Sequence, residues 1–276
     1  MMKSACLFIF SIISAIAVQI SADVGIQDSS LLHKTWKKYS QSGEEGVLDT
    51  MLQRMGIENG FFIEFGASDG KFYSNTRFLA ERGWKGAWIE CSDSCLPALY
   101  ETGRQFPNVM CINQFITANT SDKRGLPLDV VADQNFPNEE IDVLSIDIDG
   151  HDYLIFEGLK HNPKIICIES SGYWSPFLKT RVPDEIAGLN LGQPLHVMTE
   201  IARKHGYEPV CFLTVNLFLV RKDYYYLFSD IKNDAETLWL ESWTRMGEKQ
   251  DYDKSFIRER RRTSSIIQMY DPYVTP

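Results

Sequence analysis

The sequence has no excess of positive charge, because 28 Lys and Arg residues stand against 37 Asp and Glu residues and the net charge is −9. A negative chain gives no electrostatic reason to expect a nucleic-acid partner. Internal repeats and low-complexity tracts are also absent. No second cysteine pair and no histidine cluster accompanies Cys91 and Cys95, which excludes a zinc pattern. The 276 residues, 44% of them hydrophobic, are enough for one α/β domain rather than two.

Long apolar runs are missing after residue 22, so no later segment is expected to span a membrane. In residues 1–22, Lys3 precedes an apolar stretch from Ala5 to Val18 and small residues end the segment. This pattern is typical of a cleaved signal peptide, and the stretch is short for a membrane-spanning helix. An uncleaved anchor carrying a cytosolic catalytic domain is the alternative. The expected division is a signal peptide at 1–22, an irregular segment at 23–38, a main domain at 39–224 and a peripheral helical extension at 225–276.

Removal of the signal peptide leaves five cysteines, an odd number, so at least one remains a free thiol. Cys91 and Cys95 are the pair expected to be most reactive. The remaining three lie in apolar runs and are expected to be buried in strands: Cys111, Cys167 and Cys211. A glycosylation sequon at Asn119 falls in a polar loop and fits a secreted glycoprotein. The basic residues 258–262 are expected to form a solvated helix face.

Apolar runs alternate with helical patterns through the main domain. A capping box at Ser42–Glu45 predicts a helix that stops at Gly56. Strands are predicted at 60–66, 85–91, 109–116, 142–148 and 164–169, with helices at 75–82, 94–104, 153–159 and 195–205. Two further strands, at 207–214 and 217–221, are joined by a tight turn. The pattern predicts an α/β fold with a mainly parallel sheet, covered on both faces and closed by an antiparallel hairpin.

A glycine-rich turn, residues 64–70 (EFGASDG), follows the first predicted strand. Glycines at such a strand-to-helix turn let a ligand approach the backbone, and a helix N-terminus offers unpaired N–H groups. A tight connection without a ligand is the alternative. Glu90 ends the next strand about twenty residues later, where an acid is placed to bind both ribose hydroxyls of an adenosine. The spacing favours this role over that of a surface acid.

A cluster of polar residues follows the predicted strand at 142–148, namely Asp147, Asp149 and His151. Glu169 ends the neighbouring strand in the same way, so the three carboxylates are expected to converge. Close carboxylates either raise the pKa of one of them, which makes a general base, or share a divalent cation. His151 is a rival base because it titrates near neutral pH. Helix capping or binding of cofactor amides by these acids is the alternative.

The motifs YSQSGEE (39–45), FFIEFGASDG (61–70), AWIE (87–90) and LSIDIDGHDY (144–153), with the segment from Gly206 to Arg221, resemble the FkbM-type methyltransferase family. The resemblance covers about residues 39–221. It implies a Rossmann-like class I methyltransferase fold with a seven-stranded sheet, S-adenosylmethionine as cofactor, and methyl transfer to a hydroxyl oxygen. By position, Glu64, Gly66, Ser68 and Gly70 would line the cofactor pocket, Glu90 would hold the ribose, and Asp147 would lie beside the transferred methyl group.

Residues 171–193, with Tyr173, Trp174 and Phe177, occupy the place of a substrate-covering lid and match the family least. Two functions of different classes follow. The first is an O-methyltransferase in the lumen of the secretory pathway, or secreted, with Asp147, Asp149 and His151 as catalytic candidates and a glycan or small molecule as acceptor. The second is a non-enzymatic interaction or trafficking protein that keeps the fold. The presence of Glu90, Asp147 and the glycine turn favours the enzyme.

Overall fold

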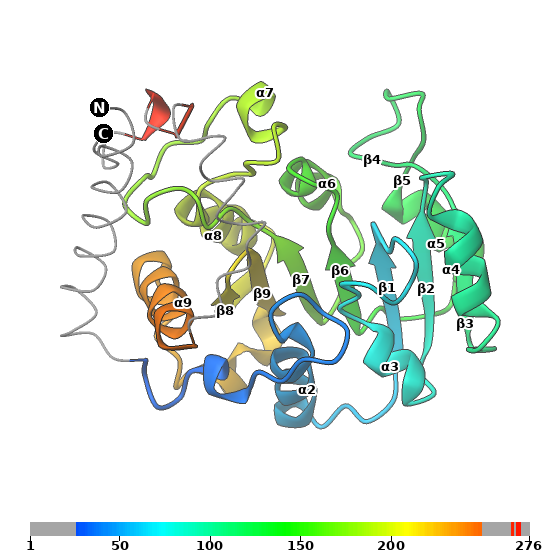
Figure 1. Cartoon of the computed structure of the whole chain (residues 1–276), viewed down its shortest axis with the longest axis horizontal. Coiled ribbons are helices and arrows are strands. Elements are labelled where there is room, and N and C mark those ends of the chain that lie inside the picture. The colour runs from blue at the N-terminus through cyan, green and yellow to red at the C-terminus, as the bar shows by residue number, and fades with distance from the viewer. Residues whose placement is uncertain (1–25, 250–265, 268, 272–276) are drawn as a thin grey trace, which may run out of the picture.

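The computed structural model describes residues 26–249, 266–267 and 269–271 (Figure 1). The expected signal peptide at 1–22 and the basic residues 258–262 lie outside the described residues. Within the described ranges, no helix combines the length and the apolar character needed to cross a bilayer.

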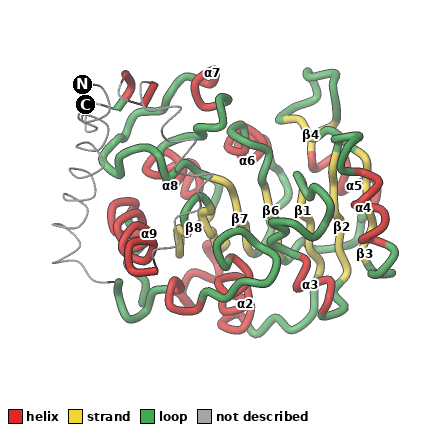
Figure 2. The backbone as a smooth tube through the Cα atoms, in the orientation of Figure 1, coloured by secondary structure: helices red, strands yellow, loops and turns green. Residues whose placement is uncertain are grey.

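A seven-stranded sheet runs through the molecule in the order β3-β2-β1-β6-β7-β9-β8 (Figures 1 and 2). Its strands are β1 (Phe61–Phe65), β2 (Lys85–Glu90), β3 (Val109–Asn113), β6 (Val143–Ile146), β7 (Ile165–Glu169), β8 (Tyr207–Leu213) and β9 (Asn216–Arg221). Five strands pair in parallel, whereas β9 pairs antiparallel with both β7 and β8. The predicted class I methyltransferase sheet with its closing hairpin is therefore confirmed.

Helices cover both faces of this sheet, because alternate side chains of each strand point to opposite sides. Phe62 of β1 packs in a core with apolar residues of α2 (Glu44–Met55), α3 (Arg77–Glu81) and α4 (Leu96–Gly103). Ile63 packs in a second core, on the other face. The helices of that core are α5 (Leu128–Asn135), α6 (Asp152–Gly158), α8 (Leu195–Lys204) and α9 (Ala235–Lys249). All five residues of β1 are buried, as expected for a strand covered on both faces.

The start of α2 differs from the predicted capping box. Gly43 is the N-cap residue and the helix begins at Glu44. The hydroxyl of Ser40, rather than that of Ser42, accepts hydrogen bonds from the N–H groups of Gly43 and Glu44 (3.3 and 3.1 Å). Glu45 in turn accepts a hydrogen bond from the Ser40 N–H (2.8 Å). The reciprocal capping therefore joins Ser40 and Glu45.

The segments on both sides of the expected main domain pack against it. The 3-10 helix η1 (Leu31–Lys34) lies within the segment predicted to be irregular, and its Leu31 and Leu32 are buried. After the hairpin, η2 (Lys222–Phe228) leads to α9, whose Leu238 and Trp239 are buried in the core beside the sheet. Over the described residues, these segments are integral to one packed domain.

The sequence predicted no elements for residues 117–141. The predicted strand at 109–116 ends earlier, at Asn113, and two short strands follow, β4 (Ile116–Thr117) and β5 (Leu126–Pro127). They pair in parallel outside the main sheet and lead into α5. The loop between them carries the sequon residue Asn119, which is exposed.

Candidate functional site

A cavity of about 860 Å³ opens at the carboxyl ends of the parallel strands. Small-molecule sites typically have volumes of about 300–1,000 Å³. The cavity wall includes Gly66 after β1, Glu90 at the end of β2, Asp147 after β6 and Glu169 at the end of β7. Ligands of open α/β sheets bind at this edge, where the strand order reverses, and here the reversal lies between β1 and β6. The predicted glycine turn and ribose acid thus face one cavity.

Gly66 adopts a conformation that its surroundings allow only for glycine. Its φ is +74°, and a Cβ atom here would lie 1.7 Å from the carbonyl oxygen of Asp147. The turn is then tied to β2, since the Ser68 N–H donates a hydrogen bond to Glu90 Oε2 (2.8 Å). Because α3 begins only at Arg77, which does not line the cavity, the loop itself rather than a helix N-terminus forms this wall.

The Glu90 carboxylate is held in place by the backbone around it. Besides the bond from Ser68, Oε1 accepts hydrogen bonds from the N–H groups of Cys91 and Ser92 (2.8 Å each). A carboxylate oxygen has two lone pairs, so Oε2 keeps one for a further donor such as a ribose hydroxyl. The position and orientation of Glu90 therefore fit the predicted ribose role.

Of the two residues at the ends of the predicted glycine turn, Glu64 lines the cavity as expected, whereas Gly70 does not. Gly70 does not line the cavity, and a Cβ atom there would meet the side chains of Leu99 and Trp88 in the core. Glu64 reaches the cavity wall, but its buried carboxylate accepts hydrogen bonds from the Ser74 hydroxyl (2.6 Å) and the Asn75 N–H (2.7 Å). Burial raises the pKa of Glu64. Both residues thus shape the loop after β1.

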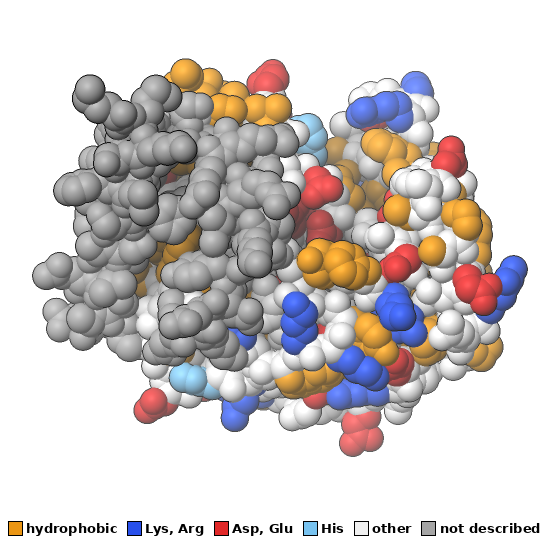
Figure 3. Space-filling view, in the orientation of Figure 1, with side chains coloured by type: hydrophobic (Ala, Val, Ile, Leu, Met, Phe, Trp, Pro, Cys, Tyr) orange, Lys and Arg blue, Asp and Glu red, His pale blue; other side chains and the backbone are white. Residues whose placement is uncertain are grey.

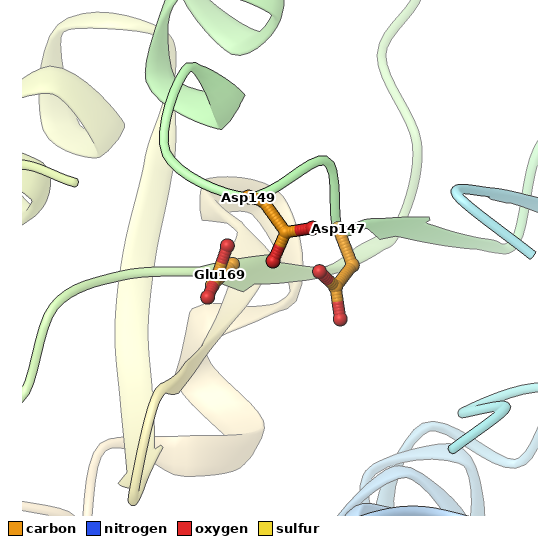
Figure 4. Close-up of side chains that lie close together, drawn as sticks. All are labelled: Asp147, Asp149 and Glu169. Atoms are coloured by element: carbon orange, nitrogen blue, oxygen red, sulfur yellow. The ribbon is translucent and has the colours of Figure 1, made fainter. Parts of the chain in front are cut away.

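Asp147, Asp149 and Glu169 come together as the sequence predicted. Each offers one carboxylate oxygen, and these oxygens lie within 4.8 Å of one another. In Figure 4 the carboxylate of Asp149 lies between the other two, and Figure 3 shows acidic side chains in the hollow of this face of the molecule. Glu169 Oε2 is buried and has no hydrogen-bond partner among the described residues. The cluster is therefore an electrostatically unfavourable arrangement without a proton or a cation.

Burial and mutual repulsion act on the acids of this cluster in the same direction. Desolvation is the main cause that raises the pKa of Asp147 well above its usual value, and the charges of Asp152 and Asp149 add to it. The pKa of Glu169 is raised well above its usual value by burial first and by the charge of Asp147 second. A carboxylate with a raised pKa is a stronger base, which suits proton abstraction.

Asp152 does not line the cavity but supports the acidic cluster, and the sequence did not single it out. Its buried carboxylate accepts hydrogen bonds from the N–H groups of Ile148 (2.8 Å) and Gly150 (2.9 Å). These bonds fix the loop in which Asp149 has a φ of +61° and faces the cluster. Burial raises the pKa of Asp152 to about 6. The signal that could have revealed it is an acid in the first turn of a helix, two residues after Gly150, where its carboxylate can reach the backbone N–H groups of the preceding loop.

His151 lines the cavity and is exposed. Its Nε2 lies 3.1 Å from the carbonyl oxygen of Asp184. A carbonyl oxygen can only accept, so Nε2 carries the proton and Nδ1 of the neutral ring is the acceptor. His151 is therefore placed as a second base at the edge of the cavity.

The expected lid, residues 171–193, is instead a packed part of the core. Trp174 is buried and its Nε1 donates hydrogen bonds to the carbonyl oxygens of Leu191 and Gly192 (3.1 and 3.2 Å). From this segment only Tyr173 and Asn190 line the cavity. Phe177 is exposed but does not contribute to the cavity wall. The segment thus supports the site more than it covers it.

Several cavity residues were not predicted from the sequence. They come from loops rather than strand ends, and the main ones are Gln41, Phe72, Tyr73, Phe115, Asp122, Arg124 and Asn190. Cys91 and Cys95, predicted as reactive thiols, also line the cavity, and all five cysteines of the described residues are free. Cys167 and Cys211 are buried as predicted, whereas Cys111 is half-buried.

Residues 112–209 match the family model described as Methyltransferase FkbM domain. The resemblance predicted from the sequence is confirmed over this stretch, which contains Asp147, Asp149 and Glu169. The match supports an S-adenosylmethionine-dependent methyltransferase as the enzyme class. A comparison with curated proteins finds no match.

Solved structures with a similar backbone are distant in sequence. The N-terminal domain of EvdMO1 with SAH bound is 11% identical at a TM-score of 0.44, over 66% of this chain and 82% of that one. A SAM-dependent methyltransferase from Aquifex aeolicus is 14% identical at a TM-score of 0.39, and the match covers 62% of this chain and 86% of that one. Monomeric WbdD is 14% identical at 0.41, over 63% of this chain. The chain spans 38% of WbdD and 51% of the citrinin polyketide synthase CMeT domain, less than two thirds of either.

Proposed function

We propose that this chain is an S-adenosylmethionine-dependent O-methyltransferase of the secretory pathway that methylates a hydroxyl group of a glycan or another small molecule. One observation carries the proposal. Gly66 and Glu90, which fit an adenosine, share a cavity with the carboxylates of Asp147, Asp149 and Glu169, which fit proton abstraction.

The cofactor half of the cavity is formed by the ends of β1 and β2. The Gly66 turn leaves its backbone open to close approach, and the Glu90 carboxylate is oriented toward a ribose by three backbone N–H groups. S-adenosylmethionine, when bound, supplies a methyl group on a positively charged sulfur that serves as its own leaving group. Acidic residues nearby favour a cationic ligand.

The acceptor half requires alignment and a base. With the cofactor bound, the cavity would have to hold the acceptor oxygen next to the methyl carbon, and a side chain of the cavity would take up the hydroxyl proton. Holding the oxygen in line with the methyl group lowers the entropic part of the barrier. Asp147 is our first choice of base because burial raises its pKa, and Asp149 and His151 are the alternatives.

A divalent cation is a second way to activate the hydroxyl. Three carboxylate oxygens within 4.8 Å are a donor set that Mg²⁺ or Ca²⁺ prefers. The buried Oε2 of Glu169, which has no hydrogen-bond partner in the described part of the chain, fits the same interpretation. Asp147, Asp149 and Glu169 would hold the ion, which would lower the pKa of a bound hydroxyl. Calorimetric titration with Mg²⁺ alone tests this, and absence of any heat of binding up to millimolar concentrations rejects it.

Binding of S-adenosylhomocysteine, measured by calorimetry on the mature chain, tests the proposed function. We expect Glu90→Ala to weaken binding about 30-fold, because one hydrogen bond to a charged group, worth about 2 kcal/mol, is lost. Glu101→Ala, which removes an exposed acid of α4, is the control and should leave the affinity unchanged. If the wild type does not bind at all, the non-enzymatic interaction protein becomes the better reading.

The secretory location is proposed from residues 1–22 and from the exposed sequon. Asn119 lies in the loop between β4 and β5, and its Oδ1 accepts a hydrogen bond from the Ser121 N–H (2.9 Å). Expression of the full chain in eukaryotic cells should give a protein whose mass falls on treatment with an N-glycosidase. The same treatment should not change Asn119→Gln. An unglycosylated wild type would favour the cytosolic anchored form.

A further inference from the structure

Two neighbouring aromatic side chains stand exposed at the wall of the cavity. Phe72 is 62% exposed and Tyr73 is 41% exposed, and both line the cavity. Their ring centroids are 3.9 Å apart and their planes are inclined by 31°. Single exposed apolar side chains are common on protein surfaces, but adjacent ones at the wall of a polar cavity point to a binding role. Figure 3 shows hydrophobic side chains beside the acidic hollow.

The loop is built to hold these rings outward. Asp69 Oδ1 accepts hydrogen bonds from the N–H groups of Lys71 (2.9 Å) and Phe72 (2.6 Å). Tyr73 has a φ of +60°, which is unfavourable for a side chain of its size, and its N–H is held by the carbonyl oxygen of Tyr39 (3.1 Å). An aromatic residue kept in a strained conformation by surrounding hydrogen bonds suggests a functional constraint.

The same loop continues toward the acidic cluster rather than away from it. Two residues after Tyr73, Asn75 Nδ2 donates a hydrogen bond to Ser145 Oγ of β6 (3.1 Å), and β6 is the strand that leads to Asp147. The aromatic pair therefore lies on a loop that spans the cavity, between Ser68, which is bonded to Glu90, and Asn75, which is bonded to β6. Glu90 and the ribose position belong to β2, two strands further along the sheet.

The charges nearby restrict what this part of the cavity can accept. Asp147, Asp149 and Glu169 provide hydrogen-bond acceptors for hydroxyl groups, but they repel an anion. Arg124, the basic residue of the opposite loop that lines the cavity, is engaged by Asp122 (2.6 Å). A ligand with one apolar face and several hydroxyl groups would satisfy both the rings and the carboxylates.

We propose that Phe72 and Tyr73 form the acceptor subsite and select an uncharged, hydroxyl-bearing ring, which stacks its apolar face on the aromatic pair. This inference rests on the proposed function, because it assigns the second half of the same cavity. Phosphorylated and carboxylated rings are excluded by the acidic cluster. In this proposal the rings hold the acceptor, and Glu90 holds the cofactor ribose.

Saturation-transfer NMR on the full chain loaded with S-adenosylhomocysteine tests the subsite. The probes are methyl β-D-glucopyranoside, benzyl alcohol and glucose 6-phosphate, which separate sugar rings, aromatic alcohols and anionic rings. We expect saturation of one neutral probe, strongest on its ring protons, and at least five-fold weaker saturation of the phosphate. Phe72→Ala should reduce the neutral signal about five-fold. Tyr226→Ala, which removes a 70% exposed ring outside the cavity, is the matched control.

The outcomes separate the two levels of the proposal. Retained cofactor affinity in Phe72→Ala, with loss of the ring signal, supports the subsite. If the cofactor product binds but Phe72→Ala leaves the ring signal unchanged, or glucose 6-phosphate is saturated as strongly as the neutral rings, the subsite is refuted and the proposed function stands. No signal from any probe with the cofactor product bound also refutes it. If S-adenosylhomocysteine does not bind, both the subsite and the proposed function are rejected.

Discussion

At the end of the cavity formed by β1 and β2, the Glu90 carboxylate accepts three backbone hydrogen bonds, whereas at the end formed by β6 and β7 a buried oxygen of Glu169 accepts none from the described residues. The first end is pre-organised for a ligand that always has the same shape. The second end concentrates three carboxylates whose repulsion is relieved by a proton, a cation or hydroxyl donors. The difference suggests that recognition is assigned to one end and chemistry to the other.

The largest effect should come from Asp147→Asn, which removes the proposed base without changing its size. The assay measures transfer of a radiolabelled methyl group to whichever neutral probe of the NMR experiment binds best. We expect the rate to fall about 1,000-fold, which corresponds to an increase of about 4 kcal/mol in the activation free energy. Affinity for S-adenosylhomocysteine should change less than ten-fold. Asp133→Asn, an exposed acid of α5 that pairs with His161, is the control. A loss of transfer below ten-fold would assign the proton to His151 or Asp149.

The close approach of Gly66 to Asp147 predicts the next effect. Gly66→Ala places a Cβ atom 1.7 Å from a backbone oxygen, so we expect a loss of about 3 kcal/mol in the free energy of unfolding. Gly56→Ala is the matched control, because its φ of +67° is similar but a Cβ atom there would meet no other atom of the described residues within 4 Å. It should lose only about 1 kcal/mol. Equal losses, measured by urea unfolding, would mean that φ alone governs both positions.

The sequence predicted the strand ends better than the loops. Glu90, Asp147 and Glu169 terminate apolar runs, and the geometry of a parallel sheet then brings such residues to one edge. Phe72 escaped notice because no periodicity constrains a loop, and its outward direction depends on the backbone conformation of its neighbours. Gly70 was placed in the pocket because a glycine in a turn does not reveal which side it faces.

The expected lid illustrates a second limit. Aromatic residues in a segment without clear periodicity fit either a cover over a cavity or a core that packs under it. Trp174 is buried and bonded to the carbonyl oxygens of Leu191 and Gly192, which lie seventeen and eighteen residues away in sequence. Such contacts are set by the tertiary fold. Asp152, which the sequence did not single out, is a similar case, since its importance lies in the two hydrogen bonds that its carboxylate accepts from backbone N–H groups.

The raised pKa of Asp152 predicts how stability depends on pH. Its pKa is about 6 in the folded protein, against an ordinary value of 3.8. Below pH 3.8 both states are protonated and the stabilisation is fully present. As the pH rises toward 6 the unfolded chain releases the proton first, so stability falls, by about 3 kcal/mol at most for this group. Urea unfolding with EDTA should show this decline between pH 4.5 and 7.

Asp152→Asn measures how much of this pH dependence of stability comes from Asp152 rather than from the neighbouring acids. The variant should lose part of the decline, because Asp147, Glu64 and Glu169 have pKa values raised in the same direction and remain. Glu185→Gln, at an exposed acid of the short helix α7 (Asp184–Ala187), is the control and should leave the curve unchanged. Stability that rises between pH 5 and 7 in the wild type would contradict the burial that we assign to this cluster.

The smallest expected effect is a gain in the free energy of unfolding. It tests whether the carboxylates at the β6–β7 end of the cavity destabilise the fold. Glu169→Gln removes one charge from the cluster, so we expect about 1 kcal/mol of added stability at pH 8. At pH 4.5 the raised pKa favours the protonated carboxyl group of the wild type, so the stability difference between the two proteins should shrink. Millimolar Mg²⁺ at pH 8 distinguishes the two ways to relieve the repulsion. If a cation is shared, Mg²⁺ stabilises the wild type more than the variant, whereas a proton-based cluster shows no such difference. A variant that is less stable than the wild type at pH 8 without Mg²⁺ would show that Glu169 is stabilising as a charge, and the contrast between the two ends of the cavity would then be lost.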